Sequence, residues 1–155
     1  MTTEKDQLCV LTDALRPVPF RKGGEVMLIY SVEQLVDALR KFINQEPRVL
    51  IVDMPKGRPQ LFIGMSKGLG AVDLYPFLAS SRSWFASAQT TYSSEDFWIT
   101  CEGEPSWYPA WAMMPVADAI EIVAYLVGHN ELPDTAEWVN LKGQRLFSLH
   151  KDCGV

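Results

Sequence analysis

Short apolar segments separated by turns fill the chain from residue 48 to residue 101, and this alternation limits the fold more than any other feature. The first segment, 48–53, is a β-branched run long enough for a strand that is covered on both faces. Turns rich in Gly, Pro or Ser follow each segment. Strands joined in this way pair antiparallel, so a meandering sheet is expected. The expected strands are 48–53, 60–65, 71–77, 84–92 and 97–101.

Two other segments have the spacing of amphipathic helices. In 32–44, apolar residues recur within an arc of about 120°, and Ser31 followed by Gln34 has the form of a capping box. The second helix is expected to begin at Pro115 and to end at Gly128. With short extended segments at the two ends of the chain, the prediction is an α+β fold. It has a mostly antiparallel sheet of about 5–7 strands and two main helices packed on it, in a single domain over residues 1–155.

The charge and the cysteine content exclude several kinds of partner. The 155-residue chain has 14 Lys and Arg against 19 Asp and Glu, a formal net charge of −5. Proteins that bind phosphate backbones rely on clustered basic residues, so direct nucleic-acid binding is not expected. No apolar run reaches the roughly 20 residues of a membrane span. The three cysteines form no close pair of the kind that binds zinc, and we expect a cytoplasmic protein without membrane contact, metal or cofactor.

Catalytic motifs are missing from the sequence. It has no HExxH, P-loop, GxGxxG dinucleotide motif or GxSxG elbow. His129 follows the glycine at the expected end of the second helix, where a cation interacts well with the helix dipole. We therefore expect no enzyme and no catalytic residue. The enzymatic alternative would use Asp53, Asp73 or Cys101 together with His129.

The segment 114–138 resembles the C-terminal signature of the Imm1 family of bacterial immunity proteins. The matching residues are Pro115, Ala119, Gly128, Pro133 and Trp138. A glycine turn at 67–70 before a strand also fits, and the resemblance covers residues 48–141. It implies a small α+β protein that binds and neutralises a toxin encoded beside it; such proteins are often paired with nucleic-acid deaminase toxins. We assign the five matching residues to the fold.

A toxin that acts on nucleic acid needs a basic groove, so its inhibitor would present acidic and aromatic side chains. Complementary charge speeds encounter and orients the partners, and Trp and Tyr are frequent binding hot spots. The predicted toxin-binding residues are Glu95, Asp96, Glu102, Glu104, Trp107, Tyr108 and Trp111, with a second group at Asp73 and Tyr75. They would occlude the active or substrate-binding site of the toxin.

Two alternatives to this surface stay open at the level of sequence. The aromatic residues between 107 and 111 would instead be core, with the acids as a solvated rim. A small-molecule binding module would bury Trp107 and Tyr108 in a pocket with a few convergent polar groups.

Overall fold

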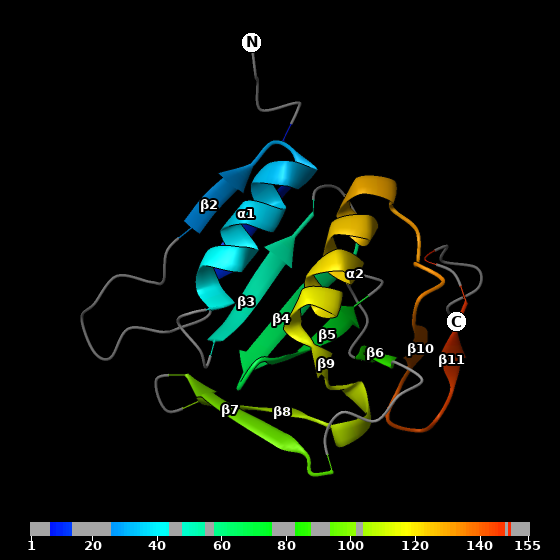
Figure 1. Ribbon diagram of the computed structural model, residues 1–155. Coiled ribbons are helices and arrows are strands. Elements are labelled where there is room, and N and C mark those ends of the chain that lie inside the picture. The colour runs from blue at the N-terminus through cyan, green and yellow to red at the C-terminus, as the bar shows by residue number, and fades with distance from the viewer. Residues whose placement is uncertain are drawn as a thin grey trace.

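The computed structural model describes residues 7–13, 26–43, 48–54, 58–75, 83–87, 94–101, 104–147 and 149. Eleven strands are found in these ranges: β1 (Cys9–Asp13), β2 (Val26–Ile29), β3 (Arg48–Asp53), β4 (Gln60–Ser66), β5 (Leu69–Tyr75), β6 (Trp84–Ser87), β7 (Phe97–Cys101), β8 (Glu104–Tyr108), β9 (Met114–Pro115), β10 (Glu137–Val139) and β11 (Arg145–Leu146). Helices α1 (Val32–Phe42) and α2 (Val116–His129) lie next to each other on one face of the larger sheet (Figure 1). The predicted α+β class is confirmed, with more strands than expected.

The larger sheet has nine strands in the order β11, β10, β6, β5, β4, β3, β1, β2, with β9 beside β5, and its pairs are antiparallel. The predicted meander is present from β3 to β6. Between β4 and β5, Lys67 and Gly68 both have positive φ, 54° and 79°, which is the geometry of a two-residue hairpin turn whose twist matches the strands. At the edges the order departs from a meander, because β1 pairs with β3 and β10 pairs with β6.

The sheet separates two hydrophobic cores, since successive residues of a strand point to opposite faces. Under the helices, the core includes Leu50, Val52, Leu61, Ile63, Val72 and Leu74. The opposite face is covered by a second, two-stranded sheet, the β7–β8 hairpin, and by a 3₁₀ turn, η3 (Ala110–Ala112). Its core consists of Val49, Ala71, Phe85, Ile99, Tyr108, Ala112 and Met113. The centre of the sheet is therefore covered on both sides, as the apolar run of β3 predicts.

Helix α1 begins where its capping residues predict. Ser31 Oγ accepts a hydrogen bond from the backbone N of Gln34 at 3.1 Å. In return Gln34 Oε1 accepts one from the backbone N of Tyr30 at 2.8 Å, so the reciprocal bond of the capping box reaches one residue further back than usual. The buried residues Leu35, Ala38, Leu39 and Phe42 face the sheet.

Helix α2 continues beyond its predicted end. Asn130, in the left-handed conformation with φ 53°, caps the helix, and Gly128 lies within the last turn. A Cβ on Gly128 would lie 3.1 Å from Cγ2 of Val32, so this glycine serves the close packing of α2 on the start of α1. The Arg58 side chain donates to the carbonyls of Leu126 and Val127, which supplies the cation that favours a helix C-terminus.

Other boundaries also differ from the prediction. Glu104–Tyr108 is absent from the expected strands but is a strand whose residues pair with β7. Within the expected strand 84–92, β6 ends at Ser87, and residues 88–92 lie outside the described ranges. None of the helices in the described ranges is long and apolar enough to cross a membrane.

Candidate binding site

A cavity of about 300 Å³ lies between the sheet and the β7–β8 hairpin. Strands β4, β5, β6 and β8 contribute to its wall, together with residues next to them in sequence. The lining residues are Phe62, Asp73, Tyr75, Ser83, Phe85, Ser106, Trp107, Tyr108 and Leu141. The cavity joins the two groups of candidate residues, since Asp73 and Tyr75 of β5 line it together with Trp107 and Tyr108 of β8.

Asp73 is the only ionisable carboxyl group among the lining residues that the structure describes. In the register of the sheet it is opposite Phe62 of β4 and Phe85 of β6, so its carboxylate shares a face with two aromatic side chains. Ser83 Oγ donates a hydrogen bond to Asp73 Oδ2 at 3.3 Å. Asp73 Oδ1 is buried and has no hydrogen-bond partner among the described residues. A buried acceptor without a partner costs about 1–3 kcal/mol.

Burial also changes the ionisation of Asp73. Desolvation of the charged form raises the pKa of this carboxyl group from 3.8 to about 7, and the hydrogen bond from Ser83 only partly opposes the rise. The group therefore titrates near neutral pH. A strongly raised pKa inside a cavity is a frequent property of functional sites.

Aromatic rings hold the walls of the cavity in edge-to-face contact. Phe62 and Tyr75 have ring centroids 5.4 Å apart with planes inclined at 70°. Phe85 contacts Tyr108 at 6.2 Å and Trp111 at 5.9 Å, also nearly perpendicular. These geometries are favourable for aromatic pairs, so the walls are packed from both the sheet and the hairpin.

Asp96 positions the indole of Trp107. Its Oδ2 accepts a hydrogen bond from Trp107 Nε1 at 3.2 Å, and its Oδ1 accepts one from the backbone N of Ala110 at 2.8 Å. Both carboxylate oxygens are thus used within the hairpin and η3. The structure gives Asp96 an internal role, and its predicted contact with a toxin stays a prediction.

The other predicted toxin-binding residues fall into different environments. Tyr108 is buried in the smaller core, whereas Trp111 is 37% exposed and Glu95 is exposed. Glu102 lies outside the described residues, and Glu104 is described only through its backbone pairing with Cys101.

Trp98 was missed in the sequence. It is 65% exposed and pairs directly with Trp107 across the hairpin. Its neighbours Phe97 and Ile99 pack into the smaller core, so alternation along β7 places Trp98 on the outer face of the hairpin. That alternation is the signal from which Trp98 was predictable. Phe62, Ser83, Phe85 and Leu141 were also missed, because only the register of the sheet and the packing of the hairpin bring them to Asp73.

Of the described side chains of the enzymatic alternative, Asp73 lines this cavity, and Asp53 and His129 do not. Asp53 is exposed and accepts a hydrogen bond from Gln60 Nε2 at 3.0 Å, and the His129 ring packs on Tyr125 with centroids 4.2 Å apart. Neither lines the cavity, and the side chain of Cys101 is not described. In the described part of the chain, no three His, Cys, Asp or Glu side chains are placed to hold a metal ion.

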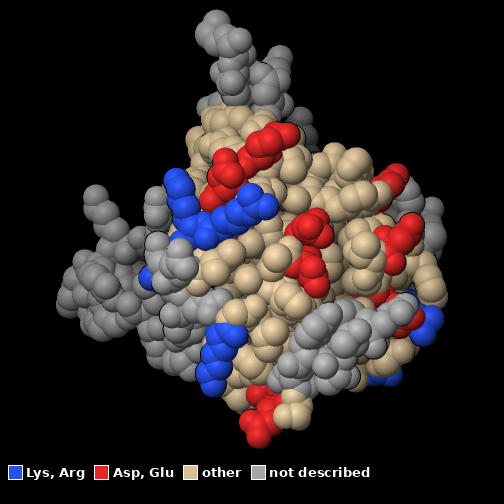
Figure 2. Space-filling view, in the orientation of Figure 1, with Lys and Arg blue, Asp and Glu red and all other residues tan. Residues whose placement is uncertain are grey.

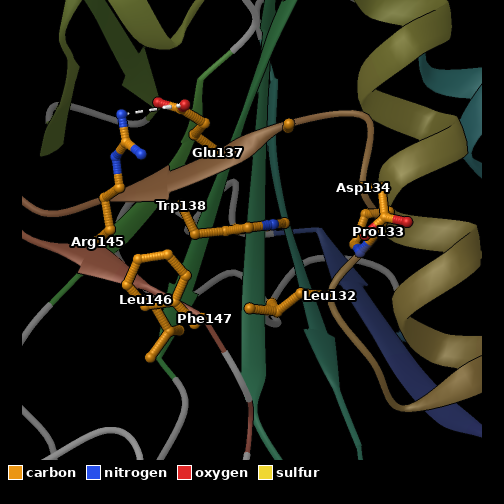
Figure 3. Close-up of a pocket in the computed structure, with 9 residues that line it drawn as sticks. Leu132, Pro133, Asp134, Glu137, Trp138, Arg145, Leu146 and Phe147 are labelled. Atoms are coloured by element: carbon orange, nitrogen blue, oxygen red, sulfur yellow. Dashed lines mark ion pairs between the residues drawn. The ribbon is translucent and has the colours of Figure 1, made fainter.

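A second cavity, of about 250 Å³, lies beside β10 and β11 (Figure 3). An ion pair between Arg145 Nη2 and Glu137 Oε1, 3.2 Å apart, spans the two strands on the exposed side. Trp138 is 2% exposed and belongs to the larger core, and its Nε1 has no hydrogen-bond partner among the described residues. This cavity lacks a buried charged group among its described residues, so the Asp73 cavity is the better candidate for recognition.

Comparison of the chain with family models and with curated protein sequences gave no match. The class that the fold defines is an α+β protein with a sheet covered on both faces. We define the hairpin surface as Glu95, Trp98, Trp107 and Trp111. This surface and the Asp73 cavity are the two candidate sites for recognition of a partner.

Proposed function

We propose that this chain is an immunity protein that binds and neutralises a bacterial toxin, a nucleic-acid deaminase, in the cytoplasm of the cell that makes both. The observation that carries the proposal is the exposure of Trp98, at 65%, on a hairpin whose other face is packed against the sheet. Trp is one of the residue types enriched among interface hot spots. The resemblance of residues 114–138 to the Imm1 signature supplies the class of partner.

Contacts within the protein hold the hairpin and the side chains of Trp107 and Trp111, which favours binding. Ile99 and Tyr108 anchor the hairpin in the smaller core, Asp96 fixes the Trp107 indole, and Phe85 supports Trp111. A side chain that is already ordered loses little conformational entropy on association. These contacts would present the aromatic groups to a partner in their bound arrangement.

The charge distribution supports a basic partner. From residue 83 to residue 141 the chain contains no Lys or Arg, although it includes four acidic residues between 94 and 104. In Figure 2, both acidic and basic side chains lie over α1, whereas the charged side chains over α2 are acidic. A nucleic-acid enzyme with a basic groove would be attracted to the acidic half, mainly through a faster association rate.

The test is protection of cells that express the toxin encoded by the neighbouring reading frame. Co-expression of this chain should restore growth, and the purified chain should inhibit deamination of a nucleic-acid substrate. Trp98→Ala should weaken toxin binding at least about tenfold. Leu28→Ala is the matched control, because Leu28 is also exposed, at 47%, but lies on β2, an edge strand of the larger sheet, outside the hairpin.

Both variants should keep the stability of the unmodified chain, since surface substitutions usually change it by less than about 0.5 kcal/mol. A chain that neither restores growth nor co-purifies with the toxin would refute the proposal. Equal toxin binding by the Trp98 and Leu28 variants would place the toxin on another surface.

A further inference from the structure

We infer that the Asp73 cavity receives the guanidinium group of an arginine side chain from a partner protein, with Asp73 as its counter-ion and the surrounding aromatic rings as its walls. The inference rests on the proposed function because it assumes that the partner is a protein. It names the chemistry by which that partner is recognised.

The carboxylate of Asp73 has the hydrogen-bonding capacity that such a group needs. Its Oδ1 is buried without a partner among the described residues, and its Oδ2 accepts one bond, from Ser83 Oγ at 3.3 Å. A donor that enters the cavity would satisfy Oδ1 and remove the desolvation penalty of an unpaired acceptor. An incoming acceptor, in contrast, would be repelled by the ionised form of the carboxyl group.

The walls favour a cation over a neutral donor. Phe62, Tyr75, Phe85, Trp107 and Tyr108 line the cavity together with Asp73, and aromatic faces attract cations that lie over them. The described lining contains no Lys, Arg or His, so no basic side chain in it neutralises Asp73. The positive charge has to come from outside the lining.

Arginine fits this environment better than lysine. A guanidinium is planar, weakly hydrated and stacks on aromatic rings, whereas an ammonium is a compact and strongly hydrated charge. The cavity offers few polar atoms that would replace the water around an ammonium, namely the carboxylate and the hydroxyls of its Ser and Tyr residues. At about 300 Å³ it is also at the lower limit of small-molecule pockets, a size suited to the end of one side chain.

Ionisation of Asp73 makes the inference testable through pH. A guanidinium keeps its charge throughout the accessible range, and it binds the carboxylate form of Asp73. Because burial raises the pKa of Asp73 to about 7, affinity should fall about 30-fold from about pH 8 to about pH 5.5. The other titratable groups that line the cavity with Asp73 are the phenols of Tyr75, on its own strand, and Tyr108, on β8. Phe62 of β4, Phe85 of β6 and Ser83, which precedes β6, are not charged.

The experiment uses the full chain and small probes, so it does not depend on any toxin. N-acetylarginine amide, free L-arginine and n-butylammonium are titrated at constant ionic strength, and binding is followed through the NMR signal of the Trp107 indole. The acetylarginine amide should bind, with the stated pH dependence, and butylammonium should bind at least about tenfold more weakly. Binding should be lost in Asp73→Asn and kept in Asp53→Asn, whose carboxylate is exposed outside the cavity.

Each other outcome overturns the inference. Absence of binding, or equal binding by the two Asn variants, would exclude the cavity as a cation site. If butylammonium binds more tightly than the acetylarginine amide, the side chain that the cavity receives is lysine and not arginine. If free L-arginine binds more tightly than the acetylarginine amide, the ligand is a free metabolite and not a protein side chain. If Asp73→Asn does not fold, the test uses the unmodified chain. Binding of the acetylarginine amide that does not change with pH would then be sufficient to refute the inference. Failure of toxin neutralisation would refute the proposed function and leave a positive probe titration standing.

Discussion

The ring of Tyr108 occupies the space that a side chain on Gly64 would need. A Cβ placed on Gly64 would lie 2.6 Å from Cε2 and 2.7 Å from Cζ of Tyr108. The absence of a side chain at one position of β4 therefore allows β8 to lie directly on the sheet. This contact seats the hairpin, and with it the wall of the Asp73 cavity.

Gly64→Ala should consequently displace the hairpin. Overpacking of this kind typically costs about 1–3 kcal/mol, and we expect a loss of that size in the free energy of unfolding, measured by denaturant titration. The comparison is the same substitution in a Tyr108→Ala background, where the ring is gone and the loss should be much smaller. An equal loss in both backgrounds would show that Tyr108 is not the group that Gly64 accommodates.

Asp73→Asn should change how stability depends on pH. The pKa of Asp73 is about 7 in the folded chain against 3.8 for the free side chain, so between these values the folded state holds a proton that the unfolded state has released. Stability due to this group is complete below about pH 4 and is lost as the pH rises through 7.

The variant cannot ionise at this position, and it should therefore be more stable than the unmodified chain at about pH 8. The difference is expected to be roughly 4 kcal/mol, measured as the difference between denaturation curves of the two proteins, and to vanish near pH 4. Asp53→Asn, at an exposed carboxylate, should show no such change. A constant difference between the Asp73 variant and the unmodified chain at all pH values would contradict the raised pKa.

Local signals in the sequence were sufficient for the elements that depend on neighbouring residues. Ser31 and Gln34 predicted the start of α1, and they make the bonds expected of them. The hairpins from β3 to β5 were predicted because their turns are short, and short turns leave few alternative pairings. Where the pairing joins distant segments, as in β1 with β3 and β10 with β6, no local signal exists.

The errors also have physical reasons. Gly128 was interpreted as a helix stop, but its missing side chain is used for the contact with Val32, and Asn130 ends the helix. Strand β8 was missed because it contains Pro105 and no β-branched residue, so its pairing with β7 and its contact with the sheet outweigh its own propensity. Asp73 with Tyr75 and Trp107 with Tyr108 were predicted as members of two separate toxin-binding groups and not as the lining of one cavity, because only the seating of β8 on Gly64 brings them together.

Substitution of Asp96 should reduce both stability and toxin binding, whereas substitution of Trp98 should reduce toxin binding alone. Asp96→Ala removes the acceptor of Trp107 Nε1 and of the Ala110 backbone N, so it should cost about 1–2 kcal/mol of stability and also weaken toxin binding. Trp98→Ala, at an exposed side chain, should weaken binding alone. Calorimetric binding and thermal unfolding of both variants distinguish these effects. An unchanged unfolding temperature for Asp96→Ala would show that its two hydrogen bonds contribute no net stability.

Trp138 should be the residue whose truncation destabilises the chain most while leaving binding intact. It is 2% exposed in the larger core, paired across the sheet with Ala86 and Leu146. Trp138→Ala should cost about 3–5 kcal/mol. Trp138→Phe should cost much less, about 1 kcal/mol, because it fills most of the volume and removes the buried Nε1 donor that has no partner among the described residues.

Phe147→Ala is the matched control for Trp138, since Phe147 lines the same cavity but is 78% exposed. It should change stability by less than about 0.5 kcal/mol. The stability of the three variants is compared through their denaturation midpoints. Toxin affinity is measured on each variant under conditions where it is folded. If Trp138→Phe is as damaging as Trp138→Ala, the indole N–H has a partner in solution, and the buried donor contributes to stability instead of reducing it.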